Sequence, residues 1–347
     1  MKGVIARYRK FLPITDETPI VSLQEGDTPL IRAYNLEKKF NFPFQLYLKY
    51  EGTNPTGSFK DRGMTVAISK AVEKKAKFVI CASTGNTSAS ASAYAVRAGL
   101  ISLVVIPEGA IALGKLSQAL LHGARVVAVK GNFDDALKIV RQICEKFPVE
   151  LVNSINPNRI EGQKTAAFEI IDALGRAPDY HAMPVGNAGN ITAYWKGFKE
   201  YSVVRPVLLG FQAAGSAPIV KGKPIKNPQT IATAIKIGNP ASWKKAEAAR
   251  DESGGVIDTV TDEEILISYK AIAQCEGLFV EPASAATVAG LIKYTKKGFF
   301  KDATKETIVT GTLTGHGLKD PDRAIAESQK PPVAEPTLED VAEKLKI

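Results

Sequence analysis

The sequence predicts an α/β protein of two domains, each built on a mostly parallel, twisted sheet covered by helices. Short apolar runs alternate with segments of helical periodicity, which is typical of βαβ units. The chain has 347 residues, more than a single hydrophobic core usually organises. Several apolar runs also end in polar, glycine-containing loops that open the next helix, as ligand-binding loops of such sheets do.

The expected strands are short and spread along most of the chain. They cover residues 77–82, 101–106, 124–129, 149–153, 180–185, 206–212 and 307–311. A helix rich in alanine and serine begins near Thr87, and helical patterns lie between most of the strands. Pro157 and a change of pattern near Asn153 indicate a domain seam, where a ligand cleft is expected. After Pro332, a polar spacer leads to an amphipathic helix over about 336–346, expected to dock on the protein surface or on a second subunit.

Composition excludes several classes of protein. Hydrophobic residues make up 45% and charged residues 23%, as in soluble globular proteins. The formal charge is +9, but lysines and arginines are scattered, so we expect no nucleic-acid partner. No apolar run approaches the length of a membrane span or a signal peptide, so we expect a cytoplasmic protein without a membrane partner. Cys81, Cys144 and Cys275 lack zinc-site spacing and are expected to be small core residues.

Lys60 is the most informative residue, because the residues around it place an amine just inside a helix. Pro55 and Gly57 mark a turn, and Ser58 is a good N-cap for the helical pattern that follows. In the first turn, the helix dipole disfavours an ammonium by roughly 0.3 to 1 kcal/mol. A neutral amine of this kind suits a Schiff base with an aldehyde. From this segment alone, a solvated lysine that follows a cap remains the alternative.

A second motif is the loop Gly-Asn-Ala-Gly-Asn at 186–190, between an apolar strand and a helix. Two glycines let backbone N–H groups converge at a helix N-terminus, where they can bind a phosphate. The loop lacks the Gly-Lys-Ser/Thr ending of a nucleotide P-loop and the spacing of a dinucleotide fingerprint. A single phosphate therefore fits better than a nucleotide, although a simple tight turn is the alternative.

A third motif, Ser-Thr-Gly-Asn-Thr-Ser at 83–88, also follows a strand and opens a helix. Its hydroxyl and N–H groups suit a carboxylate, and the Asn86 amide could contact a ring hydroxyl. An ordinary capping run is the alternative.

Two further segments carry polar groups near the expected cleft. Asn153, Ser154 and Arg159 suit a second phosphate, for which a surface loop with an exposed arginine is the alternative. Thr314 offers a neutral hydroxyl in a glycine-rich segment after the last strand, whereas the neighbouring His316 is given no role.

An activated lysine, a lone-phosphate loop, a carboxylate loop and a neutral hydroxyl together fit pyridoxal 5′-phosphate bound through a Schiff base. Over residues 22–321, the chain resembles the threonine synthases, which share the fold of the tryptophan synthase β subunit, known as fold type II of pyridoxal-phosphate enzymes. The run Ser-Phe-Lys-Asp-Arg-Gly at 58–63 is shared with threonine and serine dehydratases. Residues 153–163, the loop at 186–190 and Leu-Thr-Gly-His-Gly-Leu-Lys-Asp at 313–320 resemble threonine synthases more.

The resemblance implies roles at the cofactor. Lys60 would form the Schiff base and move protons, and Asn86 would contact the 3′-oxygen of the cofactor. Thr314 would meet the pyridine nitrogen with a hydroxyl, leaving that nitrogen largely unprotonated and favouring elimination and replacement chemistry. The cofactor phosphate would lie on five consecutive residues, Gly186, Asn187, Ala188, Gly189 and Asn190.

The resemblance also implies a substrate and a reaction. O-phospho-L-homoserine would lose phosphate from Cγ and add water at Cβ, which gives L-threonine and inorganic phosphate. The expected substrate contacts are Ser83, Thr84 and Thr87 for the carboxylate, and Asn153, Ser154 and Arg159 for the leaving phosphate. The nearest alternative is a pyridoxal-phosphate-dependent threonine or serine dehydratase, which needs no second phosphate site. A cysteine synthase and a basic binding protein that keeps only the fold are further alternatives.

Finally, the resemblance implies the domain arrangement. A small, substrate-closing domain would span 53–150, and a large, cofactor-binding domain would combine 1–52 with 151–347. A homodimer is expected from the resemblance. A metal site is not expected.

Overall fold

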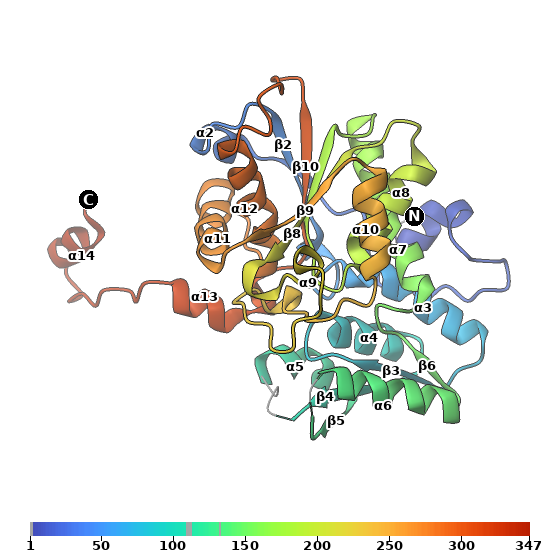
Figure 1. The fold of residues 1–347 in the computed structure, drawn as a ribbon. Coiled ribbons are helices and arrows are strands. Elements are labelled where there is room, and N and C mark those ends of the chain that lie inside the picture. The colour runs from blue at the N-terminus through green and yellow to red at the C-terminus, as the bar shows by residue number, and fades with distance from the viewer. Residues whose placement is uncertain (1–2, 109–112, 132) are drawn as a thin grey trace.

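The computed structural model describes residues 3–108, 113–131 and 133–347, and these residues form two sheets flanked by helices (Figure 1). The larger sheet has the strand order β1-β2-β10-β7-β8-β9. Its strands are β1 (Leu30–Arg32), β2 (Gln45–Tyr50), β7 (Tyr180–Pro184), β8 (Val207–Ala213), β9 (Val256–Val260) and β10 (Ile308–Leu313). All neighbouring strands in it run parallel except β1, which pairs antiparallel with β2.

The smaller sheet is fully parallel and has the strand order β5-β4-β3-β6. Its strands are β3 (Phe78–Ala82), β4 (Ile101–Pro107), β5 (Arg125–Val129) and β6 (Val149–Leu151). The two sheets confirm the expected α/β class with mostly parallel strands. They stand one above the other in Figure 1, with the larger sheet at the top.

Helices cover both faces of each sheet. The α-helices are α1 (Val4–Tyr8), α2 (Tyr34–Lys39), α3 (Lys60–Glu73), α4 (Asn86–Arg97), α5 (Leu113–Leu121), α6 (Phe133–Lys146), α7 (Pro157–Leu174), α8 (Gly189–Tyr201), α9 (Pro218–Lys221), α10 (Trp243–Glu252), α11 (Asp262–Glu276), α12 (Pro282–Lys296), α13 (Pro321–Glu327) and α14 (Leu338–Leu345). Short 3₁₀ helices are η1 (Arg9–Phe11), η2 (Glu51–Thr53), η3 (Ala214–Ser216), η4 (Thr233–Ile235) and η5 (Gly317–Lys319).

The alternation of side chains along each strand explains this two-sided packing. In β3, Val79 and Cys81 belong to a cluster with α3 and α4, whereas Ile80 and Ala82 pack with α6 on the other face. In the larger sheet, α2, α11 and α12 share one core with the strands, and α7, α8 and α10 share another. The cores on both faces fix the strands, and therefore fix the loops that follow them.

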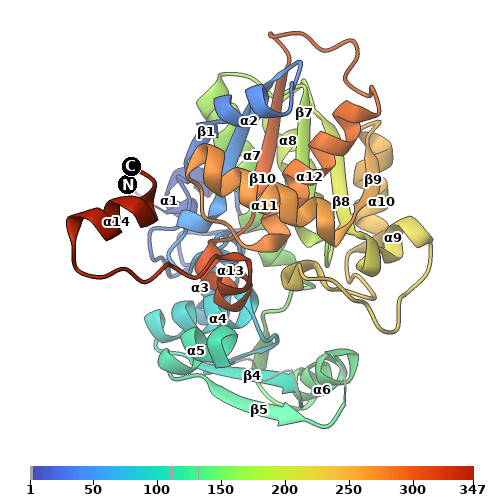
Figure 2. The same ribbon diagram turned by 90° about the vertical axis from the view of Figure 1, so that its left-hand side faces the viewer.

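The C-terminal helix is confirmed as α14, but it does not dock on the rest of its own chain. Figures 1 and 2 both show it apart from the two sheets, and Leu338 and Leu345 are exposed. The expectation that it packs on the protein's own surface is therefore wrong in this structure. Docking on a second subunit stays a prediction.

The three cysteines are only partly as expected. Cys81 is fully buried, as expected for a core residue, but Cys144 and Cys275 are only half-buried; all three are free thiols. Within the described residues, no helix is both long and apolar enough to cross a membrane.

Candidate active site

Lys60 is the first residue of α3, so it lies in the first turn of a helix, as predicted. The cap differs from the prediction: Phe59 occupies the N-cap position, and the buried Ser58 Oγ has no hydrogen-bond partner. The reason is that Ser58 pairs with Gly315 in an isolated bridge, and the Phe59 N–H donates to the Thr314 carbonyl at 3.0 Å. This pairing ties the lysine turn to the segment that follows β10.

The amine of Lys60 is held in a partly neutral state. Burial, together with the nearby Arg159 guanidinium, lowers the pKa of Lys60 to about 7, against the opposing effect of Glu281. Lys60 Nζ also lies 4.0 Å from the centre of the Phe59 ring. A lysine with a pKa near neutrality can act as a nucleophile and can exchange protons.

Two crossing helices bring Lys60 and Arg159 together. Gly63 on α3 and Gly162 on α7, each three residues after one of these cations, lie at the crossing. A β-carbon on Gly162 would lie 1.9 Å from the Arg62 carbonyl oxygen, so the two backbones touch there. The crossing therefore sets the spacing of the two side chains.

Arg159 is fully buried and only partly paired. Its Nη1 donates to the Val152 carbonyl at 2.8 Å, while Nε and Nη2 have no partner. Burial lowers the pKa of Arg159 to about 10, against the opposing effects of Cys81 and Asp61. A buried guanidinium with unused donors is a strong site for an anion such as a phosphate.

Residues 186–190 follow β7 and lead into α8, whose first residue is Gly189. Ala188 adopts a left-handed conformation with φ of 64°, and both polar atoms of the Asn190 side chain are buried without partners. A β-carbon on Gly186 would lie 2.9 Å from Ile235 Cα, so this glycine is needed for packing. A β-carbon on Gly189 would make only ordinary van der Waals contacts, the nearest at 3.6 Å from Ile160 Cδ1.

Asn187 and Ser154, predicted in two different phosphate sites, are hydrogen-bonded to each other. Asn187 Nδ2 donates to Ser154 Oγ at 2.7 Å, and its Oδ1 accepts from the Ala241 N–H at 2.7 Å. The structure therefore brings the two predicted phosphate loops side by side.

The side chain of Asn153 is used inside the small sheet. The Ala82 N–H donates to Asn153 Oδ1 at 2.9 Å, and Asn153 Nδ2 donates to the Ala82 carbonyl at 3.0 Å. This exchange fixes the loop before α7 to the end of β3. Its side chain thus has a structural function, whatever it contributes to a ligand.

The polar loop after β3 leads into α4, which begins at Asn86. Ser83 Oγ accepts from the Gly85 N–H at 3.2 Å, and the residues predicted to bind a carboxylate, Ser83, Thr84 and Thr87, are each partly exposed. Asn86 Nδ2 donates to Glu281 Oε2 at 2.9 Å. The loop therefore faces the segment before α12.

The sequence analysis missed Glu281 and Lys319. Glu281 is buried, its Oε2 accepts from Asn86 Nδ2, and its Oε1 lies within hydrogen-bond distance of Thr314 Oγ1, at 3.0 Å. Lys319 Nζ donates to the Thr56 carbonyl and to Gln118 Oε1, and burial lowers its pKa. The polar Glu-Pro pair that opens a helix after an apolar run at 278–280 was the available signal for Glu281.

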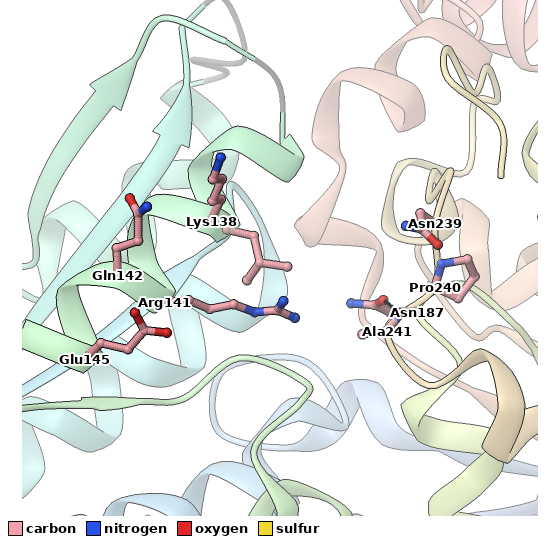
Figure 3. Close-up of a pocket in the computed structure, with 9 residues that line it drawn as sticks. Lys138, Arg141, Gln142, Glu145, Asn187, Asn239, Pro240 and Ala241 are labelled. Atoms are coloured by element: carbon pink, nitrogen blue, oxygen red, sulfur yellow. Dashed lines mark hydrogen bonds between the residues drawn. The ribbon is translucent and has the colours of Figure 1, made fainter.

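A pocket of about 530 Å³ opens next to these loops, between the two sheets (Figure 3). On one side, α6 contributes Lys138 and Arg141, with Glu145 beside them. The other side carries Asn187 and the segment 239–241. Figure 3 shows the two sets of side chains facing each other, so two exposed cations lie in front of the 186–190 loop.

The residues present fit pyridoxal phosphate. A lysine with a pKa near 7 suits its aldehyde, and the unpartnered Asn190 side chain lies at a helix N-terminus that suits its phosphate. Arg159 supplies unused donors for a second anion. No group of three or more metal-ligating side chains occurs among the residues that the structure describes.

Comparison with known proteins also points to pyridoxal phosphate as the cofactor. Residues 21–311 match the family described as pyridoxal-phosphate dependent enzyme. A threonine synthase from Synechocystis sp. is 59% identical over 94% of this chain and 86% of its own length. A threonine synthase from Halalkalibacterium halodurans is also 59% identical, over 94% of this chain and 92% of its own.

Solved structures with the same fold are more distant in sequence. An L-serine ammonia-lyase from Rhizomucor miehei superposes with a TM-score of 0.76 at 21% identity, over 87% of this chain and 97% of that one. A cysteine synthase from Entamoeba histolytica superposes with a TM-score of 0.76 at 17% sequence identity, over 93% of this chain and 94% of that one. These likenesses show the fold alone. From the family match and the 59% identical relatives, the chain belongs to the pyridoxal-phosphate dependent enzymes, in the group of the threonine synthases.

Proposed function

We propose that the chain converts O-phospho-L-homoserine and water into L-threonine and inorganic phosphate. The relatives named threonine synthase support this reaction. The structural observation that carries it is the buried Arg159, whose Nε and Nη2 are unpaired and whose charge acts on Lys60. A substrate with its own phosphate needs such a second anion site, whereas deamination of threonine or serine does not.

Lys60 is the proposed catalytic residue. Its Nζ binds the cofactor and then holds or moves a proton beside the substrate carbon atoms. When bound, pyridoxal phosphate stabilises the negative charge that develops as protons leave those carbon atoms. A pKa of about 7 lets Lys60 both accept and donate a proton near neutral pH.

Further residues hold the cofactor in this proposal. Asn86 would contact its ring oxygen, and Thr314 would contact its ring nitrogen. Gly186, Asn187, Ala188, Gly189 and Asn190 hold its phosphate at the N-terminus of α8.

The substrate lies between the two sheets. Ser83, Thr84 and Thr87, at the N-terminus of α4, bind its carboxylate through hydroxyl and N–H groups. Asn153, Ser154 and Arg159 hold its phosphate and then the departing phosphate ion. The exposed Lys138 and Arg141 at the pocket mouth attract the dianionic substrate toward this site.

The same proposal includes a small domain over 53–150 that closes on the substrate, and a large domain formed by 1–52 and 151–347. The small sheet lies wholly within 53–151, which supports this division. We also propose a cytoplasmic homodimer, on the resemblance to threonine synthases.

A product assay tests the reaction. Purified protein loaded with pyridoxal phosphate should release phosphate and threonine in equal amounts from O-phospho-L-homoserine, and the Lys60→Ala variant should release neither. Formation of 2-oxobutyrate from threonine, without phosphate release from phosphohomoserine, would instead support a dehydratase.

A further inference from the structure

Glu281 contacts both side chains that are proposed to touch the cofactor ring. Asn86 Nδ2 donates to its Oε2 at 2.9 Å, and Thr314 Oγ1 lies 3.0 Å from its Oε1. Asn86 opens α4 beside the small sheet, whereas Thr314 follows β10 in the large sheet. The buried Glu281 carboxyl therefore links the two sides of the site.

The backbone directs this carboxyl away from its own helix. Glu281 is the N-cap residue of α12, yet its side chain makes no capping hydrogen bond. Its N–H donates to the Gly315 carbonyl at 3.0 Å, and a β-carbon on Gly315 would lie 2.7 Å from the carboxyl group. The Glu281 carboxyl is therefore not used by α12 and is available to Asn86 and Thr314.

The number of available hydrogens decides how Thr314 can bind a ring nitrogen. An ionised carboxylate only accepts hydrogen bonds, so Thr314 would have to give it the single hydroxyl hydrogen. Only lone pairs of Thr314 would then face the cofactor. A neutral carboxyl can donate to Thr314 instead, while its other oxygen still accepts from Asn86.

Ser284 does not remove this requirement. Its Oγ lies 3.0 Å from Thr314 Oγ1, accepts from the Gly315 N–H at 3.1 Å and can donate to the Gly315 carbonyl at 3.3 Å. As long as the hydrogen of Thr314 goes to Glu281, neither arrangement of Ser284 supplies a donor to the cofactor.

We propose that Glu281 is a positioning residue: as a neutral carboxyl it donates to Thr314, so that Thr314 donates its own hydrogen to the ring nitrogen of the bound cofactor. The inference rests on the proposed function, in which Thr314 meets that nitrogen. It assigns Glu281 a task in keeping the nitrogen unprotonated but hydrogen-bonded.

The electrostatic surroundings of Glu281 are consistent with a neutral carboxyl. Burial raises its pKa, and the hydrogen bonds with Asn86 and Thr314 together with the Lys319 and Lys60 ammonium charges only partly oppose this effect. The two lysines lie on η5 and α3, and burial lowers the pKa of each. Lys60, with a pKa of about 7, therefore carries only part of a positive charge near neutral pH.

The test uses the protein loaded with pyridoxal phosphate labelled with ¹⁵N in the ring. The variants are Glu281→Gln, Glu281→Leu, Thr314→Val and the double variant Glu281→Leu/Thr314→Val. Glu306→Gln, a surface change in the turn before β10, is the matched control. The readouts are the ¹⁵N chemical shift of the ring nitrogen and the dissociation constant of the cofactor, neither of which requires turnover.

A glutamine reproduces the neutral carboxyl, because its amide can donate to Thr314 and its oxygen can accept from Asn86. Glu281→Gln should therefore keep the unprotonated ¹⁵N shift and the wild-type affinity. Glu281→Leu should weaken cofactor binding about tenfold, the value of one hydrogen bond, and this loss should vanish in the Thr314→Val background.

Three results would overturn the inference: a protonated ring nitrogen in the wild type that becomes neutral in Glu281→Gln, wild-type affinity in Glu281→Leu, or the same loss in both backgrounds. If Glu281→Leu does not fold, the ¹⁵N shift of Glu281→Gln decides alone. Failure to release phosphate from phosphohomoserine, with the expected ¹⁵N results, would refute the proposed reaction but not this role.

Discussion

Gly162 packs so closely on Arg62 that a β-carbon on the glycine would lie 1.9 Å from the arginine carbonyl oxygen. Gly162→Ala must push α7 away from α3, at a cost of about 1–3 kcal/mol in the free energy of unfolding. It should also move Arg159 relative to Lys60 and lower turnover. Urea unfolding of the cofactor-free protein measures the first effect. For stability, the control is Gly189→Ala, whose β-carbon would make only an ordinary contact at 3.6 Å. Equal losses in the free energy of unfolding of the two variants would contradict the tight crossing.

Arg159→Ala removes the proposed partner of the substrate phosphate. Because a hydrogen bond to a charged group contributes about 1.5–3 kcal/mol, kcat/KM for O-phospho-L-homoserine should fall roughly 10- to 100-fold or more. The visible absorption of the bound cofactor should stay unchanged. Arg159→Lys keeps the charge but loses the forked donors, so it should recover only part of the activity. Unchanged phosphate release in the alanine variant would refute the role.

The lowered pKa of Lys60 predicts a pH effect on stability in the cofactor-free protein. Between about pH 7 and the ordinary lysine value of 10.5, the unfolded chain binds a proton that the folded chain does not. The free energy of unfolding contributed by this group therefore rises with pH through that range. Lys60→Met should be more stable than the wild type below pH 7, with a gap that closes toward pH 10.5. A gap that is independent of pH would show that Lys60 is not perturbed.

Glu169 is the centre of a buried ion network that joins α7 to α3 and β2. Arg62 and Lys49 donate to it at 2.6 and 2.7 Å. Burial alone would raise the pKa of Glu169, but these two cations hold it well below its usual range. Glu169 thus adds stability above about pH 4.5 that is lost on acidification.

Glu169→Gln should therefore lower the free energy of unfolding by about 3–5 kcal/mol at pH 7, because the buried Lys49 loses its carboxylate partner and Arg62 keeps only Glu51. The difference from the wild type should narrow as the pH falls below about 4.5. Glu247→Gln, which breaks the surface pair with Lys244, should change stability by less than about 1 kcal/mol. Guanidinium unfolding at several pH values measures both differences in the free energy of unfolding. Equal destabilisation by the two variants would count against a stabilising role of the buried network.

The sequence predicted all four strands of the small sheet and three of the large sheet, but it missed β1, β2 and β9. Strands such as β3 and β8 are continuous apolar runs because helices cover both of their faces, and their ends were placed within one residue. β1 and β9 lie at the edges of the large sheet and are mostly half-buried, so their apolar pattern is weak. β2 was also missed. In its sequence, Gln-Leu-Tyr-Leu-Lys-Tyr, apolar and polar residues are mixed, so it forms no continuous apolar run.

At the site, local motifs were predictable and long-range partners were not. The lysine turn and the 186–190 loop carry their chemistry in consecutive residues. Glu281 acquires its place only through contacts with Asn86, 195 positions away, and Thr314. Ser58 fails as a cap for the same kind of reason, since it pairs with Gly315 instead.

The covalent attachment of the cofactor to Lys60 is the most direct test of the whole account. Protein loaded with pyridoxal phosphate would be reduced with borohydride, digested, and its peptides mapped by mass spectrometry. We predict the reduced cofactor on the peptide that contains Lys60. Label on Lys319, the other lysine at the site whose pKa burial lowers, or no label on any lysine, would contradict it.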